Sequence, residues 1–200
     1  MEFPDPEDSY RFADDSPLAE RAEQMFPALD GGQIERIGKL GDHLKFADGD
    51  LLFEQGKPGP GFFVLLAGWV RITSRDAAGD DIVIVEQGPG QFLAETGQLA
   101  GRPALVDGRA VGPVEALLLT PEALRQLLIV DAAIGELVMR ALILRRVALI
   151  ESGAGGPILI GTAGMPDLVR LETFCERNGT PKTVLDPATD DDAKALIERF

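Results

Sequence analysis

The chain has 200 residues, and 45% of them are hydrophobic, which supplies enough apolar surface for a packed core and argues against global disorder. Its formal net charge of −14 excludes the basic face with which a protein neutralises DNA phosphates, so we expect no DNA partner. A single cysteine, Cys175, excludes an intramolecular disulfide and zinc sites built from several thiols. Without a signal-like start or a membrane-length apolar run, we expect a cytoplasmic protein with no membrane contact.

The N-terminal residues predict a tail followed by two short helices. Residues 1–15 are rich in acid and proline, which is typical of a disordered tail. Ser16 followed by Pro17 predicts a helix start, and Asp30 is a predicted cap for a helix over residues 31–40. The single histidine, His43, lies in a predicted connector and is expected at the surface.

Short apolar runs separated by glycines dominate residues 46–119. The runs are Leu51–Gly56, Gly61–Gly68, Val70–Thr73 and Asp81–Val85. Turn signals that recur about every 8–12 residues between apolar strands predict an antiparallel sandwich or barrel. We interpret the glycines, including Gly68, as turns between separate strands, and expect Phe62 and Phe63 to lie on opposite faces of the sheet, with one facing the core.

The residues of this sheet resemble the cyclic nucleotide-binding domain of catabolite-activator-like regulators. The resemblance rests on Gly49-Asp50, Glu54-x-Gly56, Phe63-Val-Leu-Leu-Ala-Gly68-x-Val70 and Phe92-Leu-Ala-Glu95. It implies an antiparallel β-roll with flanking helices and a long C-terminal helix, over residues 16–151. It also implies a cyclic nucleotide as the ligand.

The predicted phosphate-binding segment departs from the pattern of the family. Ala94 replaces a glycine, and residues 104–106 (Ala-Leu-Val) stand where the family has Arg-(Ser/Thr)-Ala, so the arginine that pairs with the phosphate is missing. Backbone N–H groups of residues 94–96 could still hold an anion. The candidate ligand-binding residues are Ala94, Glu95 for a ribose hydroxyl, Thr96, and Arg102 or Arg109 as replacement for the missing arginine.

Two helices are predicted after the sheet. Thr120-Pro121-Glu122 is a helix start, and this helix is expected to end near Leu128. Asp131 then caps a long helix over residues 132–151, which carries more apolar residues than one buried stripe requires. The resemblance implies that this helix forms a homodimer, and the segment Ala141–Leu144, where the family contacts the base, is wholly apolar.

The last quarter of the chain predicts a βαβα unit after a linker at residues 152–157. Strands are expected at 158–161 and 183–186, and helices at 166–178 and 190–200, with Leu168, Leu171, Phe174 and Cys175 on one buried face. The order excludes a winged helix and resembles half of a thioredoxin fold. Residues 162–166 lack the Cys-x-x-Cys pair of that family, so disulfide exchange is not expected there.

Together, the two parts resemble the N-terminal region of bacterial flavoproteins of the thioredoxin reductase type. We therefore expect a regulatory module of such a protein, with no catalytic or metal-binding residues and no cofactor in this chain. FAD and NADPH would bind only in a region C-terminal to Phe200. The alternatives are a functional cyclic nucleotide receptor that uses Glu95 and Arg102, and a dimerisation scaffold without a ligand.

Overall fold

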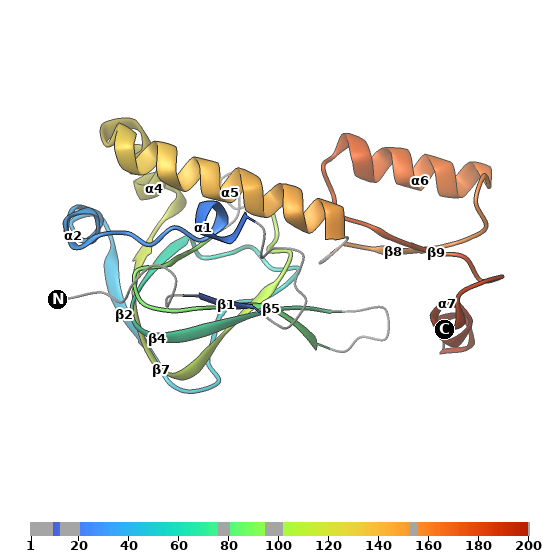
Figure 1. The fold of residues 1–200 in the computed structure, drawn as a ribbon, viewed down its shortest axis with the longest axis horizontal. Coiled ribbons are helices and arrows are strands. Elements are labelled where there is room, and N and C mark those ends of the chain that lie inside the picture. The colour runs from blue at the N-terminus through green and yellow to red at the C-terminus, as the bar shows by residue number, and fades with distance from the viewer. Residues whose placement is uncertain (1–9, 13–20, 76–80, 95–101, 153–155, 200) are drawn as a thin grey trace.

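The computed structural model describes residues 10–12, 21–75, 81–94, 102–152 and 156–199 (Figure 1). Its first part is a β-roll with helices, and its second part is a small α/β unit. In chain order, the elements are β1 Tyr10–Phe12, α1 Ala22–Met25, α2 Gly31–Gly38, β2 Asp42–Phe46, β3 Leu51–Phe53, β4 Phe62–Arg75, β5 Asp81–Gln87, β6 Phe92–Leu93, β7 Asp107–Leu119, α4 Pro121–Val130, α5 Ala132–Ser152, β8 Ile158–Ile160, α6 Pro166–Arg177, β9 Thr183–Leu185 and α7 Asp191–Arg199.

The β-roll is a seven-stranded sheet in which every pair of neighbouring strands is antiparallel. The order is β1-β5-β4-β7-β2, with β3 paired to β7 and β6 paired to β4. The long strands β4 and β7 form its centre, with Phe62 opposite Leu119 at one end and Thr73 opposite Asp107 at the other. The predicted antiparallel roll is thus confirmed.

Strand β4 runs through Gly68, where the sequence predicts a turn between two strands. Gly68 has a φ of 81°, and the pairing of β4 with β7 shifts register between Leu65 and Ala67 and again between Ala67 and Trp69. A Cβ atom at this position would lie 2.2 Å from the carbonyl oxygen of Pro113 on β7. Gly68 therefore forms a bulge where two strands approach closely, and the strand continues past it.

Two N-terminal predictions need correction. Tyr10–Phe12 form β1 on the edge of β5, so the predicted disordered tail does not hold for these three residues. The aromatic ring of Tyr10 packs against Phe26 with 5.7 Å between centroids, which accounts for the order of this acidic segment. His43 lies in β2 and not in a connector, although it is exposed as predicted.

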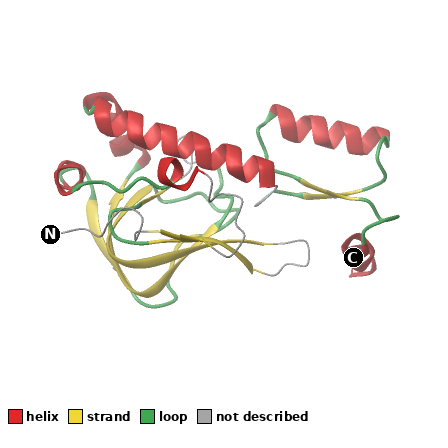
Figure 2. Ribbon diagram, in the orientation of Figure 1, coloured by secondary structure: helices red, strands yellow, loops and turns green. Residues whose placement is uncertain are grey.

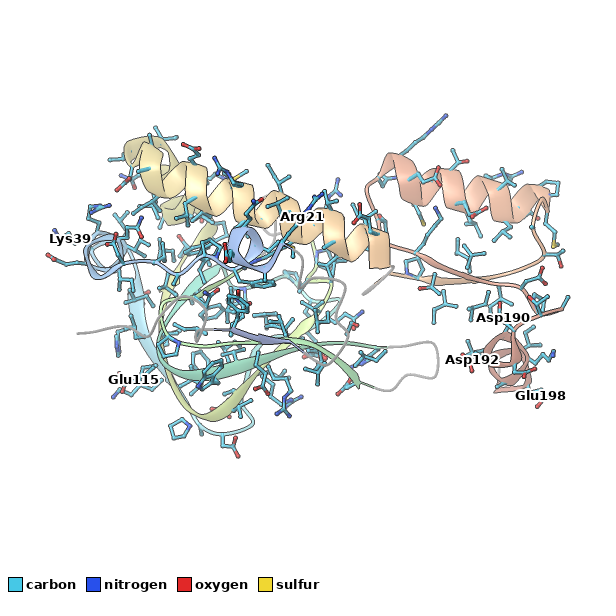
Figure 3. All side chains as sticks on the ribbon, in the orientation of Figure 1. Arg21, Lys39, Glu115, Asp190, Asp192 and Glu198 are labelled. Atoms are coloured by element: carbon cyan, nitrogen blue, oxygen red, sulfur yellow. The ribbon has the colours of Figure 1, made fainter. Side chains whose placement is uncertain are left out.

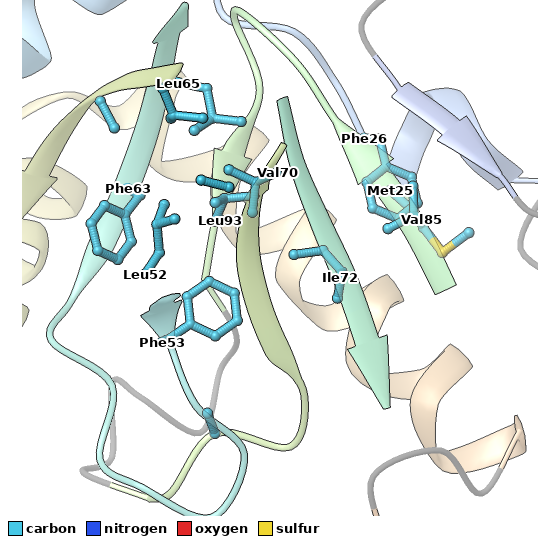
Figure 4. Close-up of a cluster of buried hydrophobic side chains, with 14 residues drawn as sticks. Met25, Phe26, Leu52, Phe53, Phe63, Leu65, Val70, Ile72, Val85 and Leu93 are labelled. Carbon is cyan, nitrogen blue, oxygen red and sulfur yellow. The ribbon is translucent and has the colours of Figure 1, made fainter. Parts of the chain in front are cut away.

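The sheet is buried on both faces of its central strand. Phe62 and Phe63 are 0% and 1% exposed, and they belong to two different apolar clusters. Phe63 packs with Leu52 and Phe53 inside the roll (Figure 4). Phe62 stacks on Phe92, with ring centroids 5.3 Å apart, in the cluster beneath α4 and α5. The two phenylalanines thus lie on opposite faces of the sheet as predicted, but both are buried, because helices cover the second face.

Capping residues define the starts of three helices as predicted. Asp30 forms a capping box with Gln33 at the start of α2, and the Thr120 hydroxyl accepts a hydrogen bond from the backbone N–H of Ala123 in α4. The carboxylate of Asp131 accepts from the N–H of Ile134 at 3.1 Å and so caps α5. Helix α4 extends to Val130, beyond the predicted end at Leu128. Helix α5 lies lengthwise across the roll (Figure 2).

The C-terminal unit has the predicted βαβα order, and β8 and β9 are parallel. Cys175 is buried as predicted, whereas Leu171 and Phe174 are 49% and 63% exposed, so the predicted four-residue buried face is wrong for these two. Only two short strands lie beside α6, which is too little surface to cover a wider stripe. Asp192 and Glu198 are exposed on α7 (Figure 3). None of the described helices is both long enough and apolar enough to cross a membrane.

Candidate functional site

A cavity of about 70 Å³ lies between the inner face of the β-roll and α5. Its walls come from α1, the roll, the segments that flank β6, and α5. The lining residues are Met25, Phe26, Phe53, Ile72, Ile84, Val85, Gln87, Leu93, Ala94, Ala104, Val106, Arg145, Ala148 and Leu149. Figure 4 shows six of these lining residues among the buried side chains: Met25, Phe26, Phe53, Ile72, Val85 and Leu93.

Small side chains create the space. Ala94 and Ala104 belong to the predicted phosphate-binding segment, and Ala148 faces them from α5. Ala104, which stands where the family has the arginine, lines the cavity with a short, uncharged side chain. This wall therefore offers hydrocarbon instead of charge.

Arg145 of α5 supplies the charge that the segment lacks. Its side chain is only 9% exposed and reaches across the cavity toward the roll. Nε donates to the carbonyl oxygen of Met25 at 2.6 Å, and Nη1 donates to that of Phe92 at 2.8 Å. The guanidinium carbon lies 4.7 Å from the ring centroids of both Phe26 and Phe92, so two cation–π contacts support it.

The third nitrogen of this guanidinium, Nη2, is buried and has no hydrogen-bond partner among the described residues. Burial lowers the pKa of Arg145 to about 9, and no acidic group among the described residues offsets this effect. At neutral pH the side chain is still a cation. The cavity thus contains a buried positive charge with an unused donor, which is the arrangement that an anion would complete.

The residues predicted to bind a ligand do not gather in this cavity. Ala94 lines it, whereas Glu95 and Thr96 lie outside the described residues. Arg102 is exposed, and its Nη1 donates to the carbonyl oxygen of Asn178 at 3.1 Å. Arg109 is also exposed and donates to that of Gly49 at 2.7 Å. Neither arginine lines the cavity in this structure.

A second hollow, of about 290 Å³, lies between the roll, α5 and the C-terminal unit. Arg102 and Arg146 line it, and both donate to backbone carbonyls just after α6: Arg102 to Asn178, and Arg146 to Gly179. Free carbonyls and a partial negative charge gather at a helix C-terminus, so two cations are favourable there. These arginines therefore clamp the C-terminal unit to the β-roll.

Sequence reasoning missed Arg145 because it considered only Ala141–Leu144 as the segment that faces the ligand. The buried side chains of α5 are those of Ile134, Val138, Ala141, Leu142 and Arg145. They recur every three or four residues, so Arg145 is a charged residue in the continuation of the apolar stripe. The place of Arg145 in this stripe is the sequence signal from which its burial could have been predicted.

Within the described residues, no group of three or more His, Cys, Asp or Glu side chains could hold a metal ion. Among the described residues that line the cavity, Gln87 and Arg145 have polar side chains, and the other walls are apolar.

Comparisons with known proteins match the β-roll. Residues 43–131 match the family model described as the cyclic nucleotide-binding domain. A curated relative is the cAMP-dependent protein kinase type I-alpha regulatory subunit of Mesocricetus auratus, which is 32% identical over 76 residues. This match covers 38% of the present chain and 42% of the kinase subunit, so most of that protein has no counterpart here.

Two solved structures share the fold. The catabolite activator protein of Thermus thermophilus has a TM-score of 0.54 at 22% identity, and the match covers 62% of this chain and 58% of that one. A transcriptional regulator from Thermotoga maritima has a TM-score of 0.50 at 20% identity, covering 57% of this chain and 90% of that one. At these identities the similarity shows the fold alone.

Proposed function

Because the β-roll has the fold of a cyclic nucleotide-binding domain, we propose that this chain is a regulatory module, not catalytic by itself, that binds a small anion between the roll and α5. The observation that supports the proposal is the guanidinium of Arg145, a residue that lines the cavity and whose buried Nη2 has no hydrogen-bond partner among the described residues. A buried, unpaired donor costs free energy that an anionic acceptor would recover. Long-range pairing of α5 with the roll through Met25 and Phe92 holds that donor in place.

The proposal is tested by calorimetry of the whole chain with acetate, benzoate, phosphate, cyclic AMP and cyclic GMP. We expect at least one anion to bind, and to bind Arg145→Met at least about tenfold more weakly, because a charge-assisted hydrogen bond contributes about 1.5–3 kcal/mol. The matched control is Arg140→Met, since Arg140 is exposed on the same helix and pairs with Glu136. Unchanged affinity in Arg145→Met would reject the site.

A second candidate is a cyclic nucleotide receptor that uses Glu95 and Arg102, and the family match favours it. In this arrangement Arg102 would have to leave the carbonyl of Asn178 and turn toward the cavity. Tight binding of cyclic AMP or cyclic GMP that is lost in Glu95→Ala and in Arg102→Ala would support this receptor. If no anion binds at all, a dimerisation scaffold without a ligand is the remaining reading.

We further propose that the module serves a flavin-dependent protein of the thioredoxin reductase type. The parallel β8–β9 pair with α6 and α7 supports a thioredoxin-like half domain, and residues 162–166 carry no thiol for disulfide exchange. FAD and NADPH would then bind outside the present chain. Sequencing the gene past the codon of Phe200 tests this, since a reading frame without a flavin-binding fingerprint in or beside it would reject the link.

We also propose that α5 pairs with a second copy of the chain. Ile143, Val147 and Ile150 are 51%, 40% and 38% exposed and follow one another at spacings of four and three residues. They form an apolar stripe next to the side chains that cover the roll. A homodimer would bury this stripe.

A further inference from the structure

The walls of the cavity between the β-roll and α5 restrict the ligand more than the fold does. Of the lining residues, only Gln87 and Arg145 have polar side chains. The amide nitrogen of Gln87 already donates to Gln91 Oε1 at 3.2 Å and to the carbonyl of Phe92 at 3.3 Å. Among the described lining residues, Arg145 Nη2 is thus the side-chain donor that remains for a ligand. The rest of the ligand would meet hydrocarbon on the described walls.

Charge matching favours a ligand with one negative charge. Arg145 is the only charged side chain that lines the described part of the cavity, and burial alone shifts its pKa. A dianion such as a phosphomonoester would keep one charge uncompensated in an apolar environment, which is costly. A carboxylate carries one charge and presents two acceptor oxygens to the guanidinium.

Polarity and size argue against a nucleotide as the ligand. A ribose and a base carry hydroxyl and amine groups that would lose water without gaining partners on walls such as Phe53, Ile72 and Leu93. The cavity of about 70 Å³ is also smaller than the roughly 150 Å³ of an apolar cavity known to admit benzene. The walls therefore suit a body smaller than an aromatic ring, such as a short branched chain.

We propose that the cavity binds a small monocarboxylate with an apolar body, with the carboxylate on Arg145 Nη2 and the body between the roll and α5. The proposal rests on the proposed function and specifies its ligand class. It sets this site apart from one selective for cyclic nucleotides, because the recognising charge comes from α5 and the body of the ligand is recognised by hydrocarbon.

The experiment is calorimetry of the whole chain with 2-methylpropanoate and 3-methylbutanoate, their neutral amides, and cyclic AMP. We expect each carboxylate to bind at least about tenfold more tightly than its amide, and this difference to disappear in Arg145→Met but persist in Arg140→Met. Equal binding of carboxylate and amide would overturn the proposal. Binding of cyclic AMP but of neither carboxylate, lost in Arg145→Met, would overturn the ligand class and leave the anion site intact. No binding of any anion would reject both.

Ala104→Leu is a second variant, which keeps Arg145 and its hydrogen bonds and narrows the cavity. Ala104 is 3% exposed and lines the wall. We expect this variant to lose 3-methylbutanoate more than acetate, since only the branched chain needs the space. Equal loss of both carboxylates would place the ligand elsewhere. This readout holds even if Arg145→Met fails to fold.

Discussion

Arg145 and Arg146 are neighbours on α5 but donate hydrogen bonds to different parts of the molecule. Arg145 Nη1 donates to Phe92 in the roll, whereas Arg146 donates to Gly179 after α6. Consecutive residues of a helix point about 100° apart, so one turn of α5 contacts both the cavity and the C-terminal unit. A shift of α5 on ligand binding would therefore also move Arg146 relative to Gly179. Because the two arginines contact different partners, their roles can be tested separately.

Replacement of Arg145 by methionine should change the free energy of unfolding of the ligand-free protein by no more than about 2 kcal/mol. The burial that lowers the pKa of Arg145 from its ordinary value to about 9 costs the charge on the order of 5 kcal/mol. Two charge-assisted hydrogen bonds, of about 1.5–3 kcal/mol each, offset most of it. Urea unfolding at pH 7 measures the balance.

The contrasting variant is Arg145→Ala, which also removes the buried side-chain volume. It should be about 2–5 kcal/mol less stable than Arg145→Met, as for other large-to-alanine changes in cores. If methionine destabilises the protein as much as alanine does, the guanidinium is a structural pin between α5 and the roll, and its role as ligand anchor loses support.

Loss of the clamp should free the segment after α6 without unfolding the β-roll. The double variant Arg102→Gln, Arg146→Gln removes the donors to Asn178 and Gly179. Since each hydrogen bond contributes about 0.5–1.5 kcal/mol, amide exchange around Thr180 should accelerate about tenfold. Hydrogen exchange with mass spectrometry measures this, and Arg109→Gln, which leaves the clamp intact, is the control. Unchanged exchange in the double variant would show that other contacts hold the unit.

A charge on the exposed stripe of α5 should dissociate the proposed dimer. Val147→Glu places a carboxylate where two copies would meet, and burial of an unpaired charge costs several kcal/mol. Analytical ultracentrifugation should show a dimer for the wild type and a monomer for this variant. Val169→Glu, on the exposed surface of α6, should remain dimeric. A wild-type monomer at all concentrations would reject the dimer.

Local signals predicted most of the secondary structure because they act within a few residues. Asp30, Thr120 and Asp131 each cap the helix that follows, as their side chains and neighbours predict. Gly68 was misinterpreted since a glycine that ends a strand and one that permits close approach look alike in sequence. Only the position of Pro113, 45 residues later in the chain, distinguishes them.

The site was harder to predict because its parts come together only through long-range packing. Ala94 belongs to the cavity as predicted, but its charge comes from Arg145, which contacts Met25 across 120 positions. Comparison with the pattern of the family shows which arginine is missing. It does not show that a helix residue supplies another charge from the opposite wall.

Acid should weaken the link between α5 and α2 through Asp131. The N–H of Ile134, and then Arg36 at 2.7 Å, stabilise the carboxylate and hold the pKa of Asp131 below its ordinary value. The resulting stability is fully present above the unfolded-state pKa of about 3.9 and is lost as the pH falls through the lower, folded-state value. Asp131→Asn keeps a capping side chain and removes the charge.

Urea unfolding at pH 7 and at several values below pH 4 measures this effect. The variant should be less stable than the wild type at pH 7, and the two curves should converge as Asp131 is protonated. Asp30→Asn, at the cap of α2, is the control for loss of a capping charge without a contact to Arg36. A stability difference that persists at the lowest pH would assign the effect to packing instead of ionisation.

Gly68→Ala should be much more destabilising than Gly112→Ala, although both glycines have positive φ. A Cβ atom on Gly112 meets no atom within 4 Å, so its cost is the left-handed backbone alone, about 1–2 kcal/mol. At Gly68 the Cβ atom would also overlap the Pro113 carbonyl, and the strands must separate, which adds about 1–3 kcal/mol. Thermal unfolding compares the two variants. Equal losses would show that β4 and β7 yield easily at this bulge and that φ, not close approach, requires the glycine.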